Sequence, residues 1–281
     1  MNLKKKAYEL RKDVVDMIYR AKTGHIGGDL SVMEILVDLY YKQMNVTPEN
    51  FKDDDHDRFV MSKGHSVEAL YAVLADRGFF PKEDLKTFAT FGSKYIGHPT
   101  NKVNGIEMNT GSLGHGLGVG VGMAIAGKMD EKNYRVYVVM GDGELAEGSV
   151  WEAAMAGSHY QLDNLTAFVD RNHLQISGTT EQVMNQKSQE KRWAAFGWNV
   201  ISVPGNDLDA IDNAVELAKK VKGKPTVIIA HTVKGCGISF VENQVGWHHH
   251  VPNDEEYQAA LKELDERGAQ CKQPHMGAFD N

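Results

Sequence analysis

Five short segments made almost entirely of apolar residues recur along the chain, with helical stretches between them. They are RFVM (58–61), RVYVVM (135–140), LTAFVD (165–170), WNVISV (198–203) and PTVIIA (225–230). Strands that are apolar at nearly every position are typical of a sheet covered on both faces. Helical patterns at 67–75, 149–159 and 208–221 separate them. Strand and helix in series predict an α/β fold: one doubly wound, mostly parallel sheet with helices on both faces.

The chain opens with an amphipathic helix. Apolar residues recur there at three- and four-residue steps from Leu3 to Ile18, and the pattern ends near Gly24. A length of 281 residues is compatible with one domain. We predict a single domain over 1–268, followed by a polar tail over 269–281.

Composition excludes several classes of function. The net charge of −7 gives no global positive field for nucleic acid or anionic lipid, and no run of about 20 apolar residues could span a membrane. The N-terminus lacks the apolar core of a signal peptide. The two cysteines, Cys236 and Cys271, show neither CxxC nor zinc spacing, which favours a reducing compartment. We therefore expect a cytoplasmic protein that binds neither nucleic acid nor membrane.

Polar residues gather where the predicted strands end. They are Gly64-His65, Gly141-Asp142-Gly143, Asn172, His231 and Lys234. Ligands of parallel α/β sheets bind at the carboxyl ends of the strands, so this clustering indicates an enzyme.

The Gly-Asp-Gly turn is the first candidate binding site. Its glycines let the backbone turn tightly, and the helix after it favours an anionic ligand. Magnesium prefers oxygen ligands, which Asp142, Asn172 and the Leu174 carbonyl could supply.

A competing interpretation uses the same turn. Residues 141–146 also satisfy the G-x-G-x-x-A dinucleotide fingerprint, and Asp170 ends the next strand, where a ribose-binding acid would lie. A nicotinamide-dependent oxidoreductase is therefore the second hypothesis. Against it, the acid is twenty-seven residues past Gly143 rather than about 20, and Asn172 and the histidines are left unexplained.

Residues 141–172, GDGELAEGSVWEAAMAGSHYQLDNLTAFVDRN, resemble the thiamine diphosphate motif, which opens with Gly-Asp-Gly and closes with Asn. Five further segments resemble transketolases specifically: KTGHIGG at 22–28, RFVMSKGH at 58–65, YIGHP at 95–99, NTGSLGHGLGVGVGMAIAGK at 109–128 and HTVKGCGISFVENQVGWH at 231–248. The resemblance runs from about residue 8 to residue 260.

The resemblance implies a thiamine diphosphate-binding fold, with Mg²⁺ or Ca²⁺ bound by Asp142, Asn172 and the Leu174 carbonyl. It places Glu147 at a subunit interface and Glu152 in the surrounding network. The cofactor contacts that it implies are His65, Gly111, Ser112, Leu113, Gly141, Asp142, Gly143, Asn172, Lys234 and His248.

Four histidines, His25, His65, His98 and His248, lie beside glycine, proline or tryptophan. Imidazole can donate or accept a proton near neutral pH, and ketol transfer moves protons on and off sugar oxygens. By resemblance, His98 holds the donor's terminal hydroxyl, and His25 and His248 handle carbonyl or alkoxide oxygens. His65 lies near the diphosphate.

The chain departs from the family's usual pattern at two of these histidines. Ile26 follows His25 where proline is common, and His249 and His250 follow His248 where glycine is common. Adjacent histidines lack the i, i+4 spacing of a helical zinc pair, so the triple histidine does not indicate a metal site.

Six glycines between Gly111 and Gly122 would each disfavour a helix by roughly 1 kcal/mol. We interpret the stretch as a helix packed closely against the cofactor or a twin subunit.

The resemblance implies transfer of a two-carbon ketol unit between a ketose and an aldose, expected to be sugar phosphates. In the family, a second domain binds the cofactor's pyrimidine ring with an activating glutamate. Because the resemblance ends near residue 260, we expect a separate C-terminal transketolase subunit to supply that domain in an α2β2 assembly. Two alternatives stay open: the alpha subunit of a 2-oxo acid dehydrogenase, which lacks the four histidines, and a non-catalytic homologue.

Overall fold

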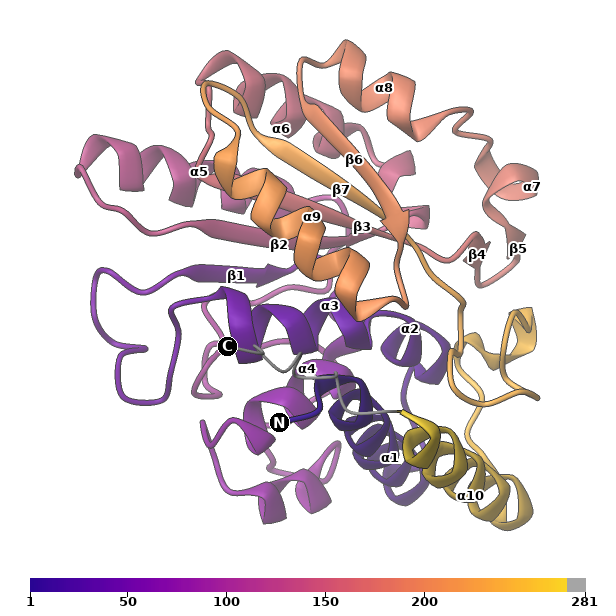
Figure 1. The fold of residues 1–281 in the computed structure, drawn as a ribbon. Coiled ribbons are helices and arrows are strands. Elements are labelled where there is room, and N and C mark those ends of the chain that lie inside the picture. The colour runs from indigo at the N-terminus through magenta and orange to yellow at the C-terminus, as the bar shows by residue number, and fades with distance from the viewer. Residues whose placement is uncertain (272–281) are drawn as a thin grey trace, which may run out of the picture.

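Five parallel strands form the central sheet, in the spatial order β1-β2-β3-β7-β6 (Figure 1). Their bounds in the computed structural model, which describes residues 1–271, are β1 Arg58–Met61, β2 Val136–Gly141, β3 Leu165–Arg171, β6 Asn199–Pro204 and β7 Thr226–His231. Every strand predicted from the apolar segments is present, and each boundary agrees to within one residue.

Helices cover both faces of the sheet, as predicted. On one face, α3 (Met33–Asp38), α4 (Val67–Asp76) and α9 (Leu208–Lys220) share a core with the sheet, and α1 (Leu3–Ala21) packs against α3 and α4. The other packs against α5 (Gly116–Met129), α6 (Gly148–His159) and α8 (Gln189–Ala195). Strand β2 shows why it is apolar throughout: Tyr137 and Val139 enter the first core, whereas Val136, Val138 and Met140 enter the second.

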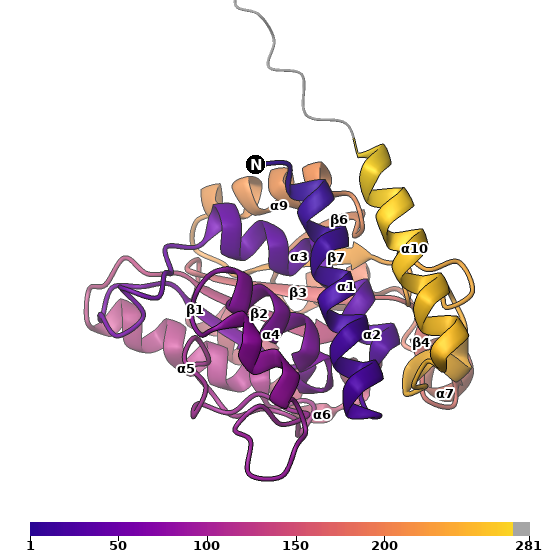
Figure 2. The same ribbon diagram turned by 90° about the horizontal axis from the view of Figure 1, so that it is seen from below.

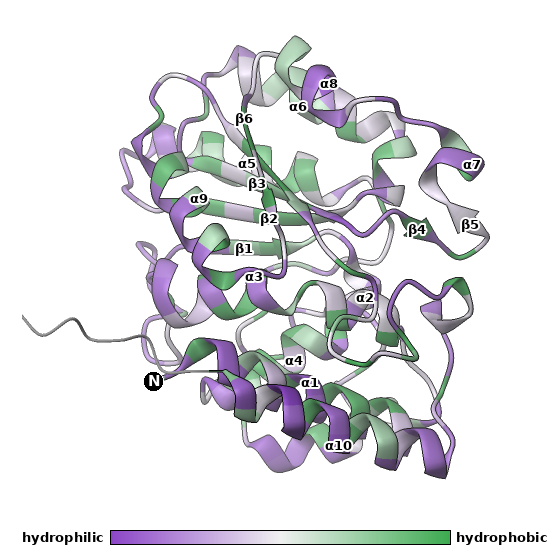
Figure 3. Ribbon diagram, turned by 45° about the vertical axis from the view of Figure 1, so that its right-hand side comes forward, coloured by the Kyte–Doolittle hydropathy of each residue, from purple (hydrophilic) through white to green (hydrophobic). Residues whose placement is uncertain are grey.

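Strand β6 is the exception to this pattern. It lies at the edge of the sheet, and its residues are only partly buried or exposed. An edge strand has one neighbour, so its side chains need not be uniformly apolar. In Figure 3 the inner strands are mostly hydrophobic, whereas the outer surfaces of the helices carry the hydrophilic residues.

The direction of winding reverses between β3 and β7. The chain steps from β1 to β2 to β3 in one direction, then passes to the edge strand β6 and returns through α9 to β7. Because crossovers between parallel strands are right-handed, the reversed step places α9 on the face opposite α5 and α6. Ligands of open α/β sheets bind at such a reversal, outside the carboxyl ends of the strands.

Helices α2 (Ile26–Ser31) and α3 were not predicted from the sequence. Every residue of both helices is buried, so neither has a polar face to mark a helical period. The buried carboxylate of Glu34 in α3 is compensated by a residue distant in sequence. Arg11 of α1 donates two hydrogen bonds of 2.7 Å to the carboxylate of Glu34.

The last helix, α10 (Asp254–Gln270), packs along α1 (Figure 2). The rings of Tyr19 and Tyr257 stack with centroids 4.0 Å apart, and the Tyr257 hydroxyl donates to Asp16. The helix continues two residues past the domain boundary predicted at 268, and positions 272–281 of the predicted tail lie outside the described residues. Within residues 1–271, no helix has both the length and the apolar character needed to cross a membrane.

Three short elements lie between β3 and α8. Strands β4 (Leu174–Gln175) and β5 (Gly178–Thr179) form an antiparallel hairpin, and α7 (Thr180–Met184) follows it. The hairpin begins directly after the carboxyl end of β3.

Helix α5 begins at Gly116 within the glycine-rich stretch, and two of its glycines are required by the chain's own sheet. A Cβ atom at Gly116 would lie 2.3 Å from Ser62, and one at Gly120 would lie 2.4 Å from a Val138 methyl. A Cβ at Gly122 would meet nothing within 4 Å. The sequence-based interpretation, packing against the cofactor or a twin subunit, is therefore corrected for Gly116 and Gly120. These two glycines allow the helix to pack closely on β1 and β2 of the same chain.

We expect Gly120→Ala to lower the free energy of unfolding by about 2 kcal/mol, because the added methyl overpacks the contact with Val138. Gly122→Ala is the matched control on the same helix. It should leave stability unchanged or raise it by up to about 1 kcal/mol, since alanine favours helix. Urea unfolding of the two variants measures both effects, and equal unfolding curves would contradict this explanation of the glycines.

Candidate active site

A cavity of about 450 Å³ opens at the carboxyl ends of the central strands. Its walls come from segments that are far apart in sequence, which the parallel strands bring to one edge of the sheet. The predicted site residues that line it are His25, His65, Gly111, Leu113, Gly141, Asp142, Gly143, Asn172, Leu174, Lys234 and His248. Glu147, predicted at an interface, also lines it and is exposed.

Two predicted contacts lie outside the cavity wall. Ser112 is exposed and does not line the cavity, unlike its neighbours Gly111 and Leu113. His98 is exposed as well, but its ring lies against Gly111, and its centroid is 6.2 Å from that of His25. His98 therefore belongs to the mouth of the cavity. Glu152 is an exposed residue of α6.

Asp142 follows β2 directly and is almost completely buried. One carboxylate oxygen accepts from the Gly143 amide at 2.9 Å, and the other accepts from the His173 amide at 2.6 Å. Burial raises the pKa of Asp142 to about 7, and the nearby Asp170 carboxylate contributes to the rise. Among residues 1–271 the Asp142 carboxylate forms no ion pair, so its charge lacks a direct counter-ion.

Asn172 and Leu174 flank a tight turn after β3. His173 between them adopts a left-handed conformation with φ of 65°, which non-glycine residues rarely do. The turn is held by the Leu174 amide, which donates to the Asn172 side-chain oxygen at 3.2 Å. Because the His173 amide also binds Asp142, the turn after β3 is tied to the turn after β2.

Lys234 connects this turn to the histidines. Its buried ammonium group donates to the Leu174 carbonyl at 3.1 Å and to Nδ1 of His248 at 2.6 Å. Burial, together with the nearby Lys63, lowers the pKa of Lys234 to about 8. The hydrogen bond from Lys234 leaves Nε2 as the nitrogen of His248 that carries the proton.

His25 lies at the centre of a group of imidazoles. Its ring centroid is 5.4 Å from that of His65, 5.8 Å from His248 and 6.2 Å from His98. Burial lowers the pKa of His25 to about 4 and that of His248 to about 3, with neighbouring positive groups adding to the effect. Burial also lowers the pKa of His65 and His98. The four imidazoles are therefore neutral at neutral pH.

Asp170 does not have the geometry that the dinucleotide hypothesis requires. Its side chain is fully buried beneath the cavity and accepts hydrogen bonds from Lys63, Thr232 and Ser31, the last at 2.6 Å. A carboxylate engaged in this way cannot bind a ribose. The nicotinamide-dependent oxidoreductase hypothesis therefore loses its proposed ribose-binding acid, Asp170, and is wrong on this point.

Sequence analysis missed two charged residues of the cavity wall. Lys63 forms the buried ion pair with Asp170, and Glu144 accepts from the amides of Gly114 and Gly141 at 2.8 and 3.1 Å. Both lie inside segments that had been singled out, RFVMSKGH and the Gly-Asp-Gly turn. Their positions just after predicted strands could have indicated that Lys63 and Glu144 reach the cavity. Nothing in the sequence shows which groups they pair with.

A pair of buried carboxyl groups was also missed. Asp29 of α2 and Glu68 of α4 lie together near the backbone of His25. Burial raises the pKa of Asp29 to about 7 and that of Glu68 well above its ordinary value, and the repulsion of Asp29 adds to the shift of Glu68. The pair therefore retains a proton at neutral pH.

The donor set at the two turns fits a hard divalent cation. It offers a buried carboxylate without an ion-pair partner, an amide oxygen and a backbone carbonyl, which are the ligands that magnesium and calcium prefer. Within residues 1–271 no three histidine, cysteine or acidic side chains form a metal-binding group, so a site built only from such side chains is not present there. The adjacent Gly143 lines the same cavity, with its amide donating to Asp142, and Lys234 adds positive charge.

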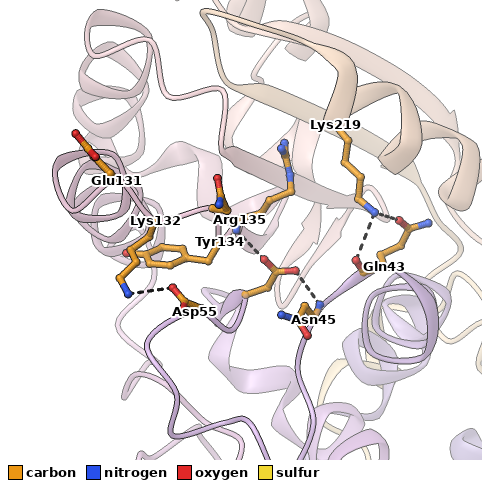
Figure 4. A pocket seen from close by; sticks show the side chains of 10 residues that line it. Gln43, Asn45, Asp55, Glu131, Lys132, Tyr134, Arg135 and Lys219 are labelled. Atoms are coloured by element: carbon orange, nitrogen blue, oxygen red, sulfur yellow. Dashed lines mark hydrogen bonds and ion pairs between the residues drawn. The ribbon is translucent and has the colours of Figure 1, made fainter.

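A second hollow, of about 520 Å³, lies at the amino ends of β1 and β2 (Figure 4). Its charged side chains are largely satisfied within the chain. Asp57 accepts from the Asn45 and Arg135 amides, Lys132 pairs with Asp55, and Lys219 donates to Gln43. None of the predicted site residues lies there, whereas most of them line the cavity at the carboxyl ends, which is therefore the candidate site.

Residues 3–271 match the family described as the transketolase, thiamine diphosphate binding domain. The chain belongs to the transketolase family. It is 51% identical over 267 residues to one of the subunits of the apulose-4-phosphate transketolase of Phocaeicola vulgatus, with 95% of each chain covered. It is 42% identical over 270 residues to the 6-deoxy-6-sulfo-D-fructose transketolase subunit SqwG of a Clostridium species, covering 96% of this chain and 98% of that one.

Longer transketolases match over part of their length. The human enzyme is 41% identical over 247 residues, which are 88% of this chain and 39% of the human protein. The structure of the Leishmania mexicana transketolase superposes with a TM-score of 0.86 at 27% identity, covering 96% of this chain and 45% of that one. This chain is therefore the N-terminal, thiamine diphosphate-binding part of a transketolase and spans less than half of these longer relatives.

Proposed function

We propose that this chain binds the diphosphate end of metal-linked thiamine diphosphate in a transketolase that transfers a two-carbon ketol unit between sugar phosphates. A C-terminal transketolase subunit supplies the pyrimidine-binding domain, in an α2β2 assembly. The observation that carries the proposal is the joining of the Asp142 and Asn172 turns to the imidazole cluster through Lys234. The names of the relatives, each called a transketolase subunit, support the need for a partner.

Asp142, Asn172 and the Leu174 carbonyl would hold Mg²⁺ or Ca²⁺, with the cofactor's diphosphate completing the coordination. Gly143 would approach the diphosphate through its backbone amide, in exchange for the hydrogen bond that this amide donates to Asp142. His65 and Lys234 would lie on the same side. Binding of the cation to Asp142 would also neutralise the carboxylate that Asp170 repels. The bound cofactor supplies the electron sink for cleaving the ketose carbon–carbon bond.

The imidazoles would manage the protons of the sugar. A neutral imidazole has one nitrogen that donates and one that accepts, so His25 can take a proton from a sugar hydroxyl and return it. Nδ1 of His25 is buried and has no hydrogen-bond partner within residues 1–271, and the His25 side chain lines the cavity. Lys234 holds His248 in one tautomer, and the exposed His98 would bind the donor's terminal hydroxyl.

The substrate is proposed to be a ketose with an anionic end group. One relative is named for a sugar phosphate and another for a sulfonated sugar. The end group itself would be bound largely by the partner subunit. Both cysteines of the described residues are free, which is compatible with the reducing cytoplasm that the sparse cysteine usage favours.

We expect His25→Ala and His98→Ala to lower turnover of the assembled enzyme by about 10²–10⁴-fold, the usual contribution of an acid–base group. Affinity for thiamine diphosphate should stay near the parental value, because neither side chain lies at the Asp142 turn. Steady-state kinetics and cofactor calorimetry measure the two effects separately. His159→Ala, at the exposed end of α6, is the control and should change neither turnover nor cofactor affinity. Parental turnover in both active-site variants would refute the proposed roles.

A further inference from the structure

The three consecutive histidines after Trp247 have three different environments. His248 accepts a hydrogen bond from Lys234. His250 packs edge-on against Trp247 with ring centroids 4.3 Å apart, and its Nε2 lies 3.1 Å from the Glu256 carboxylate. His249 is exposed and forms no hydrogen bond or ion pair with any other residue of 1–271. Both of its ring nitrogens are therefore free to bind something that comes from outside the described chain.

The ring of His249 lies against the imidazole cluster. Its centroid is 4.6 Å from that of His25, and the two planes are 84° apart. This is the shortest of the ring contacts that His25 makes, since those to His65, His248 and His98 range from 5.4 to 6.2 Å. His249 is thus a fifth imidazole of the cluster, and it is exposed whereas His25 is half-buried.

The position of His249 fits contact with the sugar rather than with the cofactor. Lys234 and His248 connect the imidazole cluster to the turn after β3, where the diphosphate is proposed to bind. His249 instead contacts the cluster through His25. The exposed rings of His98 and His249 both lie beside His25, within reach of the carbons of a ketose whose reacting oxygens would lie at His25. A neutral imidazole offers one donor and one acceptor, which matches a hydroxyl group.

We infer that His249 is a substrate-binding residue that forms a hydrogen bond with a hydroxyl of the sugar chain and so contributes to the choice of sugar. This inference rests on the proposed function. It assigns His249 to the sugar, leaves cofactor binding to the residues already described, and separates its role from that of the adjacent His250.

The test uses the assembled enzyme with its partner subunit. Apulose 4-phosphate and fructose 6-phosphate serve as donors, and glyceraldehyde 3-phosphate serves as the acceptor. His249→Phe keeps a ring against His25 but removes both polar atoms. It should raise the KM for the donor by roughly 5-fold, as expected for one lost hydrogen bond, with kcat and thiamine diphosphate affinity close to parental. His249→Asn restores a donor and an acceptor and should recover part of the loss.

The matched control is His250→Phe, which makes the same substitution one residue along and should keep the parental KM for both sugars. A parental KM in His249→Phe would overturn the inference, because ring packing alone would then be sufficient. Equal losses in donor binding and in thiamine diphosphate affinity in His249→Phe would also overturn it, by indicating a structural role. If the parental assembly transferred no ketol unit from either of the two donors, the proposed function would be refuted, and so would the role of His249.

Discussion

Asp142→Ala should weaken thiamine diphosphate binding to the assembled enzyme by about 100-fold or more and abolish its dependence on a divalent cation. Loss of a partner in the outer shell of a metal site typically lowers affinity by 10–100-fold, and loss of a ligand should do at least as much. Asp142 is the one carboxylate of the proposed donor set, and its two backbone hydrogen bonds hold it in place without neutralising its charge. Titration calorimetry with and without magnesium measures the effect.

The pH dependence of cation binding gives this prediction an independent signature. Asp142 must lose its proton to bind a cation, and its pKa is raised to about 7. Cation affinity of the parental enzyme should therefore fall as pH decreases below 7, by about 10-fold per pH unit. Asp142→Asn, which cannot titrate, should show weak binding without this dependence.

Asp163→Ala is the control for the loss of a carboxylate. Asp163 lies near the amino end of β3, where it pairs with Lys128, and its removal should leave cofactor affinity unchanged. Cation-dependent binding of normal strength in Asp142→Ala would contradict the metal assignment.

The strands could be predicted because their burial is a local property of the sequence. Residues such as Val138 and Val139 enter opposite cores, so an apolar residue is needed at each, and the segment is recognisable without knowledge of its neighbours. The same reasoning could not show that β6 lies at the edge. It also missed α2 and α3, because a helix that is buried on every side has no amphipathic period.

The part of the candidate site that directly follows the strands could be predicted from the sequence. Asp142 and Asn172 each follow a strand, and parallel neighbours bring such positions together. The strand-end position of Asp170 allows its interpretation as a ribose-binding acid. Spacing cannot reveal its actual partner, Lys63, which is 107 residues away in the sequence. The Arg11–Glu34 ion pair and the Asp29–Glu68 carboxyl pair were missed for the same reason. Residue type and spacing show which groups reach the cavity, but not how buried charges are paired.

The described chain alone, supplied with thiamine diphosphate and magnesium, should show no ketol transfer above the uncatalysed rate. It provides the turns after β2 and β3 and the imidazoles, and residues 1–271 contain one central sheet with the cavity at its carboxyl ends. The resemblance to transketolases assigns the activating glutamate and the pyrimidine pocket to a second domain. The human and Leishmania enzymes are more than twice as long as the part that this chain matches.

The measurement compares three samples in one ketol-transfer assay: this chain, the candidate C-terminal subunit, and the two mixed. Only the mixture should turn over. If the assembly is α2β2, its activity should stop rising once the partner subunit has been added to about a 1:1 molar ratio. Mixing the partner with Asp142→Ala is the control, because activity should then stay absent although both subunits are present. Because the proposal assigns the pyrimidine ring to the partner, full turnover by this chain without its partner would disprove the division of the site between two subunits.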